Sequence, residues 1–361
     1  MPRCYMGAHN DKVTVREVFV SDFHFPAEWE RHRATWLSWP HNAETWPGER
    51  LARVQKVYRE FVAFLAQGED VHISVPDVQT AAALQHTLHE EGTHTERIWL
   101  HLFPTNDAWC RDHGPSFVFD KAGHKCIVNW GFNSWGSKYP YALDNQIPAR
   151  VAEAQSLPLL EPAMILEGGS VDVNGAGCLL TTSSCLLTPT RNPGMSKEDI
   201  EAALRKYYGA EQIVWLGDGI AGDDTDGHID DITRFVSEDH VVTVVENNPD
   251  DENYKPLQEN LERLKSVRLK DGRSLRITTL PMPEPVFDEG LRLPASYANF
   301  YIANAGVVVS VFGCPQDEEA LDILRGCFDR PVVGLPARDI VYGLGTFHCL
   351  SQQEPAVRKD I

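Results

Sequence analysis

Two stretches that lie far apart in this chain carry the residue types used in covalent catalysis. Cys349 follows His348 near the C-terminal end, and His228 and Asp230 lie in an acidic stretch far upstream. A thiol acts as a nucleophile when a histidine and carboxylates surround it, and folding often brings such groups together from distant segments. We therefore predict an enzyme whose cysteine attacks a cationic carbon.

The acidic stretch at residues 224–231 places a histidine and a carboxylate two positions apart. If this stretch is a strand, His228 and Asp230 project from the same face and can address one ligand. Residues 232–245 read as a buried hairpin, which would place the polar pair at the mouth of a core strand. A solvated turn with an ordinary hydrogen-bonded pair is the alternative interpretation.

Two further motifs supply carboxylates. Asp112 follows Trp109 just before a Gly-Pro break, and Glu167 precedes two glycines that let backbone approach a ligand closely. Asp112 can bind a fork of donors while Trp109 lies against an apolar or delocalised surface, although a β-turn with a surface ion pair also explains that motif. Together, Asp112, Glu167 and Asp230 would be costly to bury without a cation. A planar guanidinium with five donors matches two carboxylates, so we predict a guanidinium site.

The composition indicates a folded, acidic protein. The 361 residues are 42% hydrophobic and 24% charged, which is ample for one large globular domain. Lys and Arg number 33 against 52 Asp and Glu, and the net charge of −19 disfavours nucleic acid and anionic lipid while favouring a cationic partner. No segment suits a secretory signal or a membrane span, so we expect a cytoplasmic protein without a membrane partner. The eight cysteines lack paired short spacings and are expected to be free.

Two kinds of element alternate along the chain. Helical periodicity occurs in five segments: 51–67, 81–89, 196–207, 254–265 and 318–328. Hairpins, each a polar start, a Gly/Asn/Asp-rich turn and an apolar strand, are predicted in four segments: 116–130, 170–187, 232–245 and 300–312. The spacing predicts a pseudo-repeat of hairpin plus helix.

The two ends of the chain could complete a fifth unit. A strand at residues 34–39 could pair with one at residues 347–352, which would place Cys349 beside the beginning of the chain. Strands that converge on a common axis give an α/β fold with a central site. We therefore predict one domain over residues 1–361, with residues 1–20 as a flexible N-terminal extension. Two independent α/β domains are the alternative.

Other binding motifs fail on inspection. Gly217–Gly222 matches the spacing of a dinucleotide fingerprint, but Asp218, Asp223 and Asp224 would repel a phosphate and no helix follows the glycines. A helix-loop-helix calcium site aligned on Gly227 places Gly222 at the first ligand position. We expect no organic cofactor and no metal.

The motifs together resemble a known family, the agmatine deiminase branch of the guanidine-modifying pentein superfamily, which is related to bacterial peptidylarginine deiminases. The resemblance covers most of the chain, and its motifs occur in the family's order: residues 26–30 with 36–40, 109–115, 166–170, 226–231 and 348–355. It implies a five-bladed α/β-propeller of ββαβ-type units around a central active site, which agrees with the pseudo-repeat.

The resemblance also implies a reaction, the hydrolysis of agmatine to N-carbamoylputrescine and ammonia without a cofactor. Cys349 would be the nucleophile, and His228 the general acid and then the general base. Asp112 and Asp230 would hold the guanidinium, and Glu167 would line the same pocket and help to orient the guanidinium or His228.

The remaining implied contacts concern the rest of the substrate. Trp109 would pack on its methylene chain, and Asp224 would lie near its distal amine. A homodimer is expected by analogy with the family. The family usually has Gly-Asn-Ile-His-Cys where this chain has Gly345-Thr346-Phe347-His348-Cys349, and this difference leaves the preferred guanidine open.

Two other functions remain open at this point. One is a deiminase for peptidylarginine or free arginine, although a carboxylate-bearing substrate would want an arginine in a pocket whose motifs offer mostly acids; Arg111 and Arg234 are the residues that could provide one. The other is a binder of polyamines or guanidines that performs no chemistry, in which Cys349 would be inert toward thiol reagents.

Overall fold

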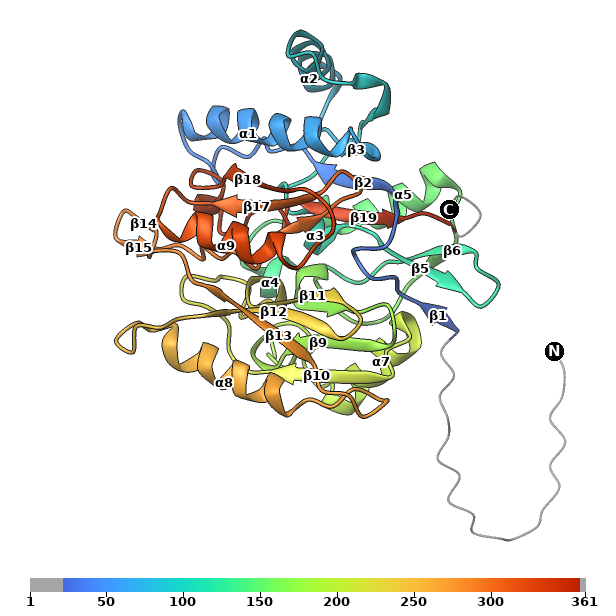
Figure 1. Cartoon of the computed structure of the whole chain (residues 1–361). Helices are drawn as coiled ribbons and strands as arrows, with labels where there is room; N and C mark the ends of the chain where they lie inside the picture. The colour runs from blue at the N-terminus through green and yellow to red at the C-terminus, as the bar shows by residue number, and fades with distance from the viewer. Residues whose placement is uncertain (1–21, 358–361) are drawn as a thin grey trace, which may run out of the picture.

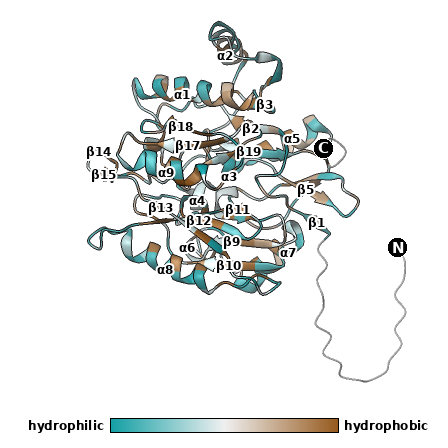
Figure 2. Ribbon diagram, viewed as in Figure 1, coloured by the Kyte–Doolittle hydropathy of each residue, from teal (hydrophilic) through white to brown (hydrophobic). Residues whose placement is uncertain are grey.

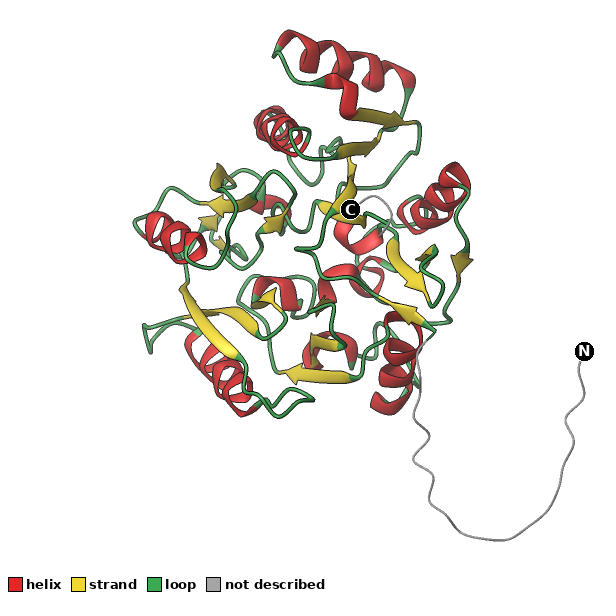
Figure 3. Cartoon of the chain, turned by 45° about the vertical axis from the view of Figure 1, so that its right-hand side comes forward, coloured by secondary structure: helices red, strands yellow, loops and turns green. Residues whose placement is uncertain are grey.

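The computed structural model describes residues 22–357 of the chain. Within them, five sheets of three or four strands stand around a common centre, with the long helices on the outside (Figures 1 and 3). This arrangement agrees with the predicted α/β-propeller. The predicted flexible extension, residues 1–20, lies outside the described residues.

Each sheet repeats one pattern of strands. In one of them, β11 (Thr233–Ser237) and β12 (His240–Val245) form an antiparallel pair, the helix α8 (Tyr254–Ser266) follows, and β13 (Arg276–Pro281) then pairs parallel to β12. A tight turn can join an antiparallel pair, whereas a parallel strand needs a long crossover, which the helix provides. The ββαβ unit implied by the sequence is therefore present.

The other units follow the same order along the chain. Their strands, with a short hairpin of β14 and β15 between β13 and β16, are β1 (Phe23–His24), β2 (His32–Ser38), β3 (Asp70–Ser74), β4 (Ile98–His101), β5 (Ser116–Asp120), β6 (Lys125–Val128), β7 (Leu159–Leu160), β8 (Val171–Val173), β9 (Cys178–Thr182), β10 (Gln212–Leu216), β14 (Phe287–Asp288), β15 (Leu291–Arg292), β16 (Tyr301–Ile302), β17 (Val307–Val311), β18 (Val332–Pro336) and β19 (Ser351–Pro355). Their helices are α1 (Arg50–Leu65), α2 (Val78–Glu90), α3 (Cys110–His113), α4 (Ser134–Ser137), α5 (Ile147–Gln155), α6 (Ser183–Leu186), α7 (Lys197–Tyr208) and α9 (Gln316–Arg325).

Single turns of 3-10 helix connect several of these elements. They are η1 (Thr95–Arg97), η2 (Asp144–Gln146), η3 (Gly168–Ser170), η4 (Ile229–Asp231) and η5 (Val341–Gly343). Two of them, η3 and η4, come directly before a strand that faces the centre, and both matter for the site described below.

The two ends of the described chain pair with each other, as the sequence predicts. β19 runs antiparallel to β2, with Ser351 opposite Leu37 and Gln352 opposite Trp36. β3 and β4 then extend this sheet in parallel, which completes the fifth unit. Because β19 begins two residues after Cys349, this closure fixes the cysteine near the centre of the ring.

The burial pattern explains why the strands lie inside and the helices outside. Every residue of β12 is buried, because the sheet is covered on both faces, whereas α8 buries one stripe that includes Leu257 and Leu264. Figure 2 shows the same contrast, with hydrophobic strands and helices of mixed character. The five predicted helices and four predicted hairpins are confirmed, with ends shifted by a few residues.

The sequence prediction missed the helix of one unit. α5 is short and carries Pro148 in its first turn, where proline is tolerated because the first amide of a helix needs no partner. That proline hides the helical periodicity. None of the helices in residues 22–357 has the length and apolar character that crossing a bilayer requires.

Candidate active site

The residues at the centre come from equivalent places in the five units. Each lies in the short segment just before the first strand of its ββαβ unit. These segments are 110–113 before β5, 167–170 before β8, 228–231 before β11, 299–300 before β16 and 348–350 before β19. The fold therefore brings Asp112, Glu167, His228, Asp230 and Cys349 together.

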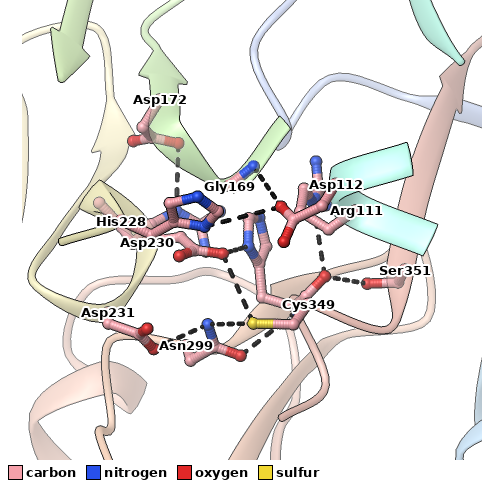
Figure 4. A network of polar contacts seen from close by, with 12 residues as sticks. Arg111, Asp112, Gly169, Asp172, His228, Asp230, Asp231, Asn299, Cys349 and Ser351 are labelled. Atoms are coloured by element: carbon pink, nitrogen blue, oxygen red, sulfur yellow. Dashed lines mark hydrogen bonds and ion pairs between the residues drawn. The ribbon is translucent and has the colours of Figure 1, made fainter. Parts of the chain in front are cut away.

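Cys349 contributes its sulfur atom to this cluster. Its thiol is 6% exposed, and its Sγ lies 3.8 Å from Asp230 Oδ2 and 3.1 Å from Asn299 Nδ2 (Figure 4). Burial, and then the nearby charges of Asp230, Asp231 and Asp112, raise the pKa of the thiol well above its usual value. Without a bound cation, Cys349 is therefore held as a thiol.

Asp230 is held by the residue that precedes the cysteine. His348 Nδ1 lies 2.6 Å from Asp230 Oδ2, and His348 Nε2 lies 2.8 Å from Glu28 Oε2. Burial disfavours the charge of Asp230, but the hydrogen bond and charge of His348 outweigh it and lower the pKa of that carboxyl. Asp230 Oδ1 has no hydrogen-bond partner in the described residues, which leaves this oxygen available to a ligand.

Two buried arginines complete this network away from the cavity. Arg111 Nη2 lies 3.1 Å from Glu28 Oε2, and Arg234 Nη2 lies 3.0 Å from the same oxygen, while Arg234 Nε donates to Asp172 at 3.1 Å. Burial opposes the charge of Glu28, yet Arg234, His348 and Arg111 together lower the pKa of its carboxyl well below the usual range. Both arginines are therefore engaged by carboxylates beneath the site.

His228 lies opposite this group, beside Asp112. The two are separated by 3.6 Å between His228 Nδ1 and Asp112 Oδ1, and both ring nitrogens of His228 are buried without a hydrogen-bond partner among the described residues. Burial opposes the imidazolium, but Asp112, Asp230 and Glu167 outweigh it and raise the pKa of His228. A histidine whose pKa is raised keeps its proton to a higher pH, which suits a general acid.

The local structure around His228 differs from the strand considered above. His228 has extended φ and ψ angles and directly precedes η4, so Asp230 lies in a 3-10 turn and not in a strand. Asp223 shapes the loop by accepting hydrogen bonds from the backbone of Gly227 and, more weakly, His228. The pair still addresses one place, but it does so because a turn bends the chain there.

Asp112 is oriented by two donors from different units. Its Oδ1 accepts a hydrogen bond from the backbone N–H of Gly169 at 3.0 Å, and its Oδ2 accepts one from Trp135 Nε1 at 2.9 Å. Position 169 requires glycine, because a Cβ there would lie 2.6 Å from His228 Nδ1. Burial, followed by the charges of Asp230 and Glu167 working against that of His228, raises the pKa of Asp112 to about 6.

Glu167 already has a cationic partner inside the protein. Arg191 Nε donates to Glu167 Oε1 at 2.8 Å, and Arg191 also binds the carbonyl of Thr225 and the carboxylate of Asp226. Arg191 therefore supplies the cation that the sequence led us to expect from the substrate. Its other oxygen, Oε2, is buried without a hydrogen-bond partner in the described residues, and Arg191 ties Glu167 to the loop that leads to His228.

A cavity of about 920 Å³ gives access to the cysteine. Cys349, Asp112, Trp109 and Asp224 line it, whereas Glu167, His228 and Asp230 are not among its lining residues. The wall also carries further acids: Glu44, Asp107, Asp144, Asp223, Asp288 and Glu289. This excess of carboxylates over cations favours a positively charged ligand.

Trp109 and Asp224 occupy different parts of that wall. Trp109 is buried and packs against Trp46, with ring centroids 5.3 Å apart. Asp224 is partly exposed and accepts a hydrogen bond from Tyr139 Oη at 2.7 Å. The aromatic ring therefore suits an apolar chain, whereas the carboxylate already has a cationic neighbour, Lys138, whose Nζ lies 3.2 Å from Asp224 Oδ1.

Sequence reasoning missed several residues of the site. Asn299, Glu28 and Arg191 were not singled out, and His348 was quoted only as the neighbour of Cys349. The pseudo-repeat contains a signal for Asn299, because it precedes the first strand of its hairpin, as the other central residues do. Glu28 lies in the motif at residues 26–30 that carries part of the resemblance, whereas Arg191 offers no such signal, since its importance comes from contacts with residues distant in sequence.

Two groups of buried donors in residues 22–357 have ligand atoms within 4.8 Å of one another, a spacing that could hold a metal ion. They are Glu167, Cys185 and His228, and Asp230, Asp231 and Cys349. Because both groups contain residues proposed below to react or to hold substrate, we assign no metal to either. Seven cysteines in the described part of the chain are free, and Cys4 lies outside it.

Comparison with known proteins agrees with this geometry. The family model of Porphyromonas-type peptidyl-arginine deiminases matches residues 24–355. The chain belongs to this family. An agmatine deiminase of Pseudomonas aeruginosa is 35% identical over 363 residues, which cover 93% of this chain and 96% of that protein.

Solved structures of this family share the fold closely. An agmatine deiminase of Enterococcus faecalis has a TM-score of 0.85 at 32% identity, and the match covers 92% of this chain and 96% of that one. A C. jejuni agmatine deiminase has a TM-score of 0.81 at 29% identity, covering 93% and 97% of the two chains. The fold is thus the pentein fold predicted from the motifs.

Proposed function

We propose that this chain is an agmatine deiminase, a hydrolase that converts agmatine to N-carbamoylputrescine and ammonia. The observation that carries the proposal is the common cavity of Cys349 and Asp112, with Asp230 in contact with the sulfur. The relatives that match almost the whole chain are named for the same activity. A thiol surrounded by acids is poorly suited to an anionic substrate and well suited to a guanidinium.

Two carboxylates hold the guanidinium in this proposal. Asp230 offers Oδ1, which has no other hydrogen-bond partner in residues 22–357, and Asp112 lies on the other side of the site with its oxygens fixed by Gly169 and Trp135. A planar group gripped from two sides loses its freedom to rotate, so its central carbon stays next to Sγ.

The bound cation also prepares the nucleophile. Burial and, after it, the neighbouring carboxylates raise the pKa of Cys349, and a guanidinium between these carboxylates offsets their effect and favours the thiolate. The thiolate forms a C–S bond to the guanidinium carbon. His228 gives a proton to the departing nitrogen, and the C–N bond breaks. Ammonia departs, and a covalent amidino-thioether remains on the cysteine.

Water completes the cycle with the same histidine in the opposite role. Neutral His228 removes a proton from water, which attacks the amidino carbon, and the C–S bond then breaks to return the thiolate. Glu167, placed by Arg191 beside the His228 loop, helps to orient the histidine. The atoms balance without an oxidant, a reductant or a further reactant.

The distal part of the cavity supports agmatine over substrates that carry a carboxylate. Trp109 packs on the methylene chain, and Asp224 lies near the amine. Among the described residues that line the cavity, the only Arg or Lys is Arg292, whose Nη1 already binds Asp251 at 2.9 Å and Glu252 at 3.2 Å. The carboxylate of free arginine or of a C-terminal peptidylarginine would find no uncommitted cation there.

The wider setting is part of the same proposal. A homodimer follows by analogy with the family, and a cytoplasmic location follows from the composition. One catalytic domain over the whole chain is supported by the family match over residues 24–355.

A panel of three guanidines tests the substrate. Purified protein is incubated with agmatine, arginine and a peptidylarginine, and ammonia and the ureido product are measured. Agmatine should have the highest kcat/KM by a wide margin. A higher kcat/KM with peptidylarginine, the substrate in the family's description, would instead favour that activity, and no ammonia from any of the three would leave only a binding protein.

A further inference from the structure

Asn299 is the only uncharged side chain whose hydrogen bond to the sulfur of Cys349 is seen in the described residues. Its Nδ2 lies 3.1 Å from Cys349 Sγ and 3.0 Å from Asp231 Oδ1 (Figure 4). Asn299 is 1% exposed and lies just before β16, so a different unit of the ring supplies it. The amide is therefore built into the centre and is not a surface group that happens to be near.

The neighbours of Asn299 decide which way its amide points. Thr346 Oγ1 lies 2.6 Å from Asn299 Oδ1, and the backbone N–H of Cys349 points at the same oxygen from 3.4 Å. The backbone N–H can only donate, so it needs an oxygen opposite it. Nδ2 must then face Sγ and Asp231, and Sγ is the acceptor in that contact.

An acceptor role suits the ionised sulfur. A thiolate accepts a hydrogen bond from an amide more strongly than a thiol does, because hydrogen bonds to charged groups are the stronger kind. The hydroxyl of Thr346 also stands at the position where the motif that this chain resembles has an asparagine. Here the amide arrives from β16's side of the ring, and the residue at 346 orients it.

We propose that Asn299 is the donor that stabilises the thiolate of Cys349, and that Thr346 is the positioning residue that aims its amide at the sulfur. The nucleophilic role of Cys349 in turnover rests on the proposed function, but the ionisation of its thiol does not. The ionisation of the Cys349 thiol can therefore be measured on the free protein, without agmatine.

The charges around the sulfur set the background for that measurement. Asp230 and Asp231 face it from η4 and Asp112 from α3, and all three oppose ionisation, as does burial. His348, on the same segment, and His228, across the site, are the nearby groups that can carry positive charge. The donor from Asn299 acts against a strongly negative surrounding, so its loss should be easy to detect.

The test compares variants of Thr346 by alkylation. The rate at which iodoacetamide labels Cys349 is followed by mass spectrometry as a function of pH in the full-length protein. Thr346→Val removes the hydroxyl and keeps the shape, whereas Thr346→Ser keeps the hydroxyl. At a fixed pH below the apparent pKa, labelling should slow by about tenfold in Thr346→Val, the change that one pKa unit represents. Thr346→Ser should stay within about twofold of the parent protein.

A matched control separates this effect from a loss of stability. Thr35 is also fully buried, and its hydroxyl donates to Glu69 Oε1 and lies 2.7 Å from Tyr301 Oη, so Thr35→Val removes buried hydrogen bonds away from the sulfur. It should lower the melting temperature without changing the pH profile of labelling. Asn299→Ala removes the donor itself and should slow labelling at least as much as Thr346→Val.

The outcomes are distinct. Parent-like labelling profiles in both Thr346→Val and Asn299→Ala, with both proteins folded, would overturn the inference. A shift in Thr35→Val as large as that in Thr346→Val would overturn it too, because the effect would then be one of stability. If agmatine is not a substrate but the labelling profiles shift as expected, the proposed function fails while this inference stands.

Discussion

The imidazole of His348 lies 2.6 Å from the carboxylate of Asp230, and this buried contact holds the carboxylate in place. Its other nitrogen lies 2.8 Å from Glu28, so one ring spans two acids. The two contacts place both ring nitrogens of His348 against carboxylates. His348, the neighbour of the proposed nucleophile, thus fixes the orientation of Asp230, the carboxylate proposed to hold the substrate.

Substitutions of His348 should separate its two contacts. The amide of Asn reaches roughly where Nδ1 lies and that of Gln roughly where Nε2 lies, so His348→Asn can keep the bond to Asp230 and His348→Gln the bond to Glu28. We expect His348→Gln to lose roughly 10- to 100-fold in kcat/KM for agmatine, the range for a hydrogen bond to a charged group, mainly through KM. His348→Asn should lose less.

His32 offers the control for that experiment. It is another buried histidine between two acceptors, with Nδ1 at 3.0 Å from Glu69 and Nε2 at 2.7 Å from the carbonyl of Glu28, but it does not touch Asp230. His32→Gln should lower the melting temperature and leave KM close to that of the parent enzyme. Equal kinetic losses in His348→Gln, His348→Asn and His32→Gln would mean that His348 acts through stability alone.

Removal of the nucleophile should separate chemistry from binding. Cys349→Ser should reduce ammonia release from agmatine by at least about a thousandfold, because a hydroxyl is far less ionised than a thiol at neutral pH. Calorimetry should still detect agmatine binding, since Asp112 and Asp230 remain. Unchanged turnover would remove Cys349 from the mechanism.

The pH dependence of kcat/KM should report Asp112. Its pKa is raised to about 6, so below that pH the free enzyme carries a neutral acid that no longer attracts a guanidinium. We expect kcat/KM to fall as the pH drops through about 6. The fall in kcat should be less steep, because bound substrate favours the carboxylate. In Asp112→Asn, kcat/KM should be low throughout, and this acid limb should disappear. An unchanged limb in that variant would assign the titration to another group.

A charged electrophile should label Cys349 faster than its neutral counterpart. 2-Chloroacetamidine and 2-chloroacetamide have nearly the same shape, but only the first is a cation that Asp112 and Asp230 can hold and that favours the thiolate. The ratio of their labelling rates on Cys349 should exceed the ratio on a free small thiol by at least about tenfold. Asp230→Asn should bring the two ratios together, and equal ratios in the parent protein would argue against the acidic grip.

The sequence predicted the repeated unit because its signals are local. The run of β-branched residues in β12 and the single apolar stripe of α8 depend only on neighbours along the chain. The same is true of the motifs around Asp112, Glu167 and His228, which can be read as separate pieces. Where a local signal was weak, as for α5 with Pro148 in its first turn, the prediction failed.

The tertiary structure decided which pieces meet and what charge each carries. Cys349 and Asn299 lie in different units, and only closure of the ring brings the amide to the sulfur. The sequence suggested that Glu167 needs a cation from the substrate, whereas in the structure Arg191 is already bound to it. Electrostatic energy depends on distance and burial in space, and neither quantity is encoded in the spacing of residues along a chain. The sequence therefore predicted the residue types of the site, and only the tertiary structure determined their partners and charges.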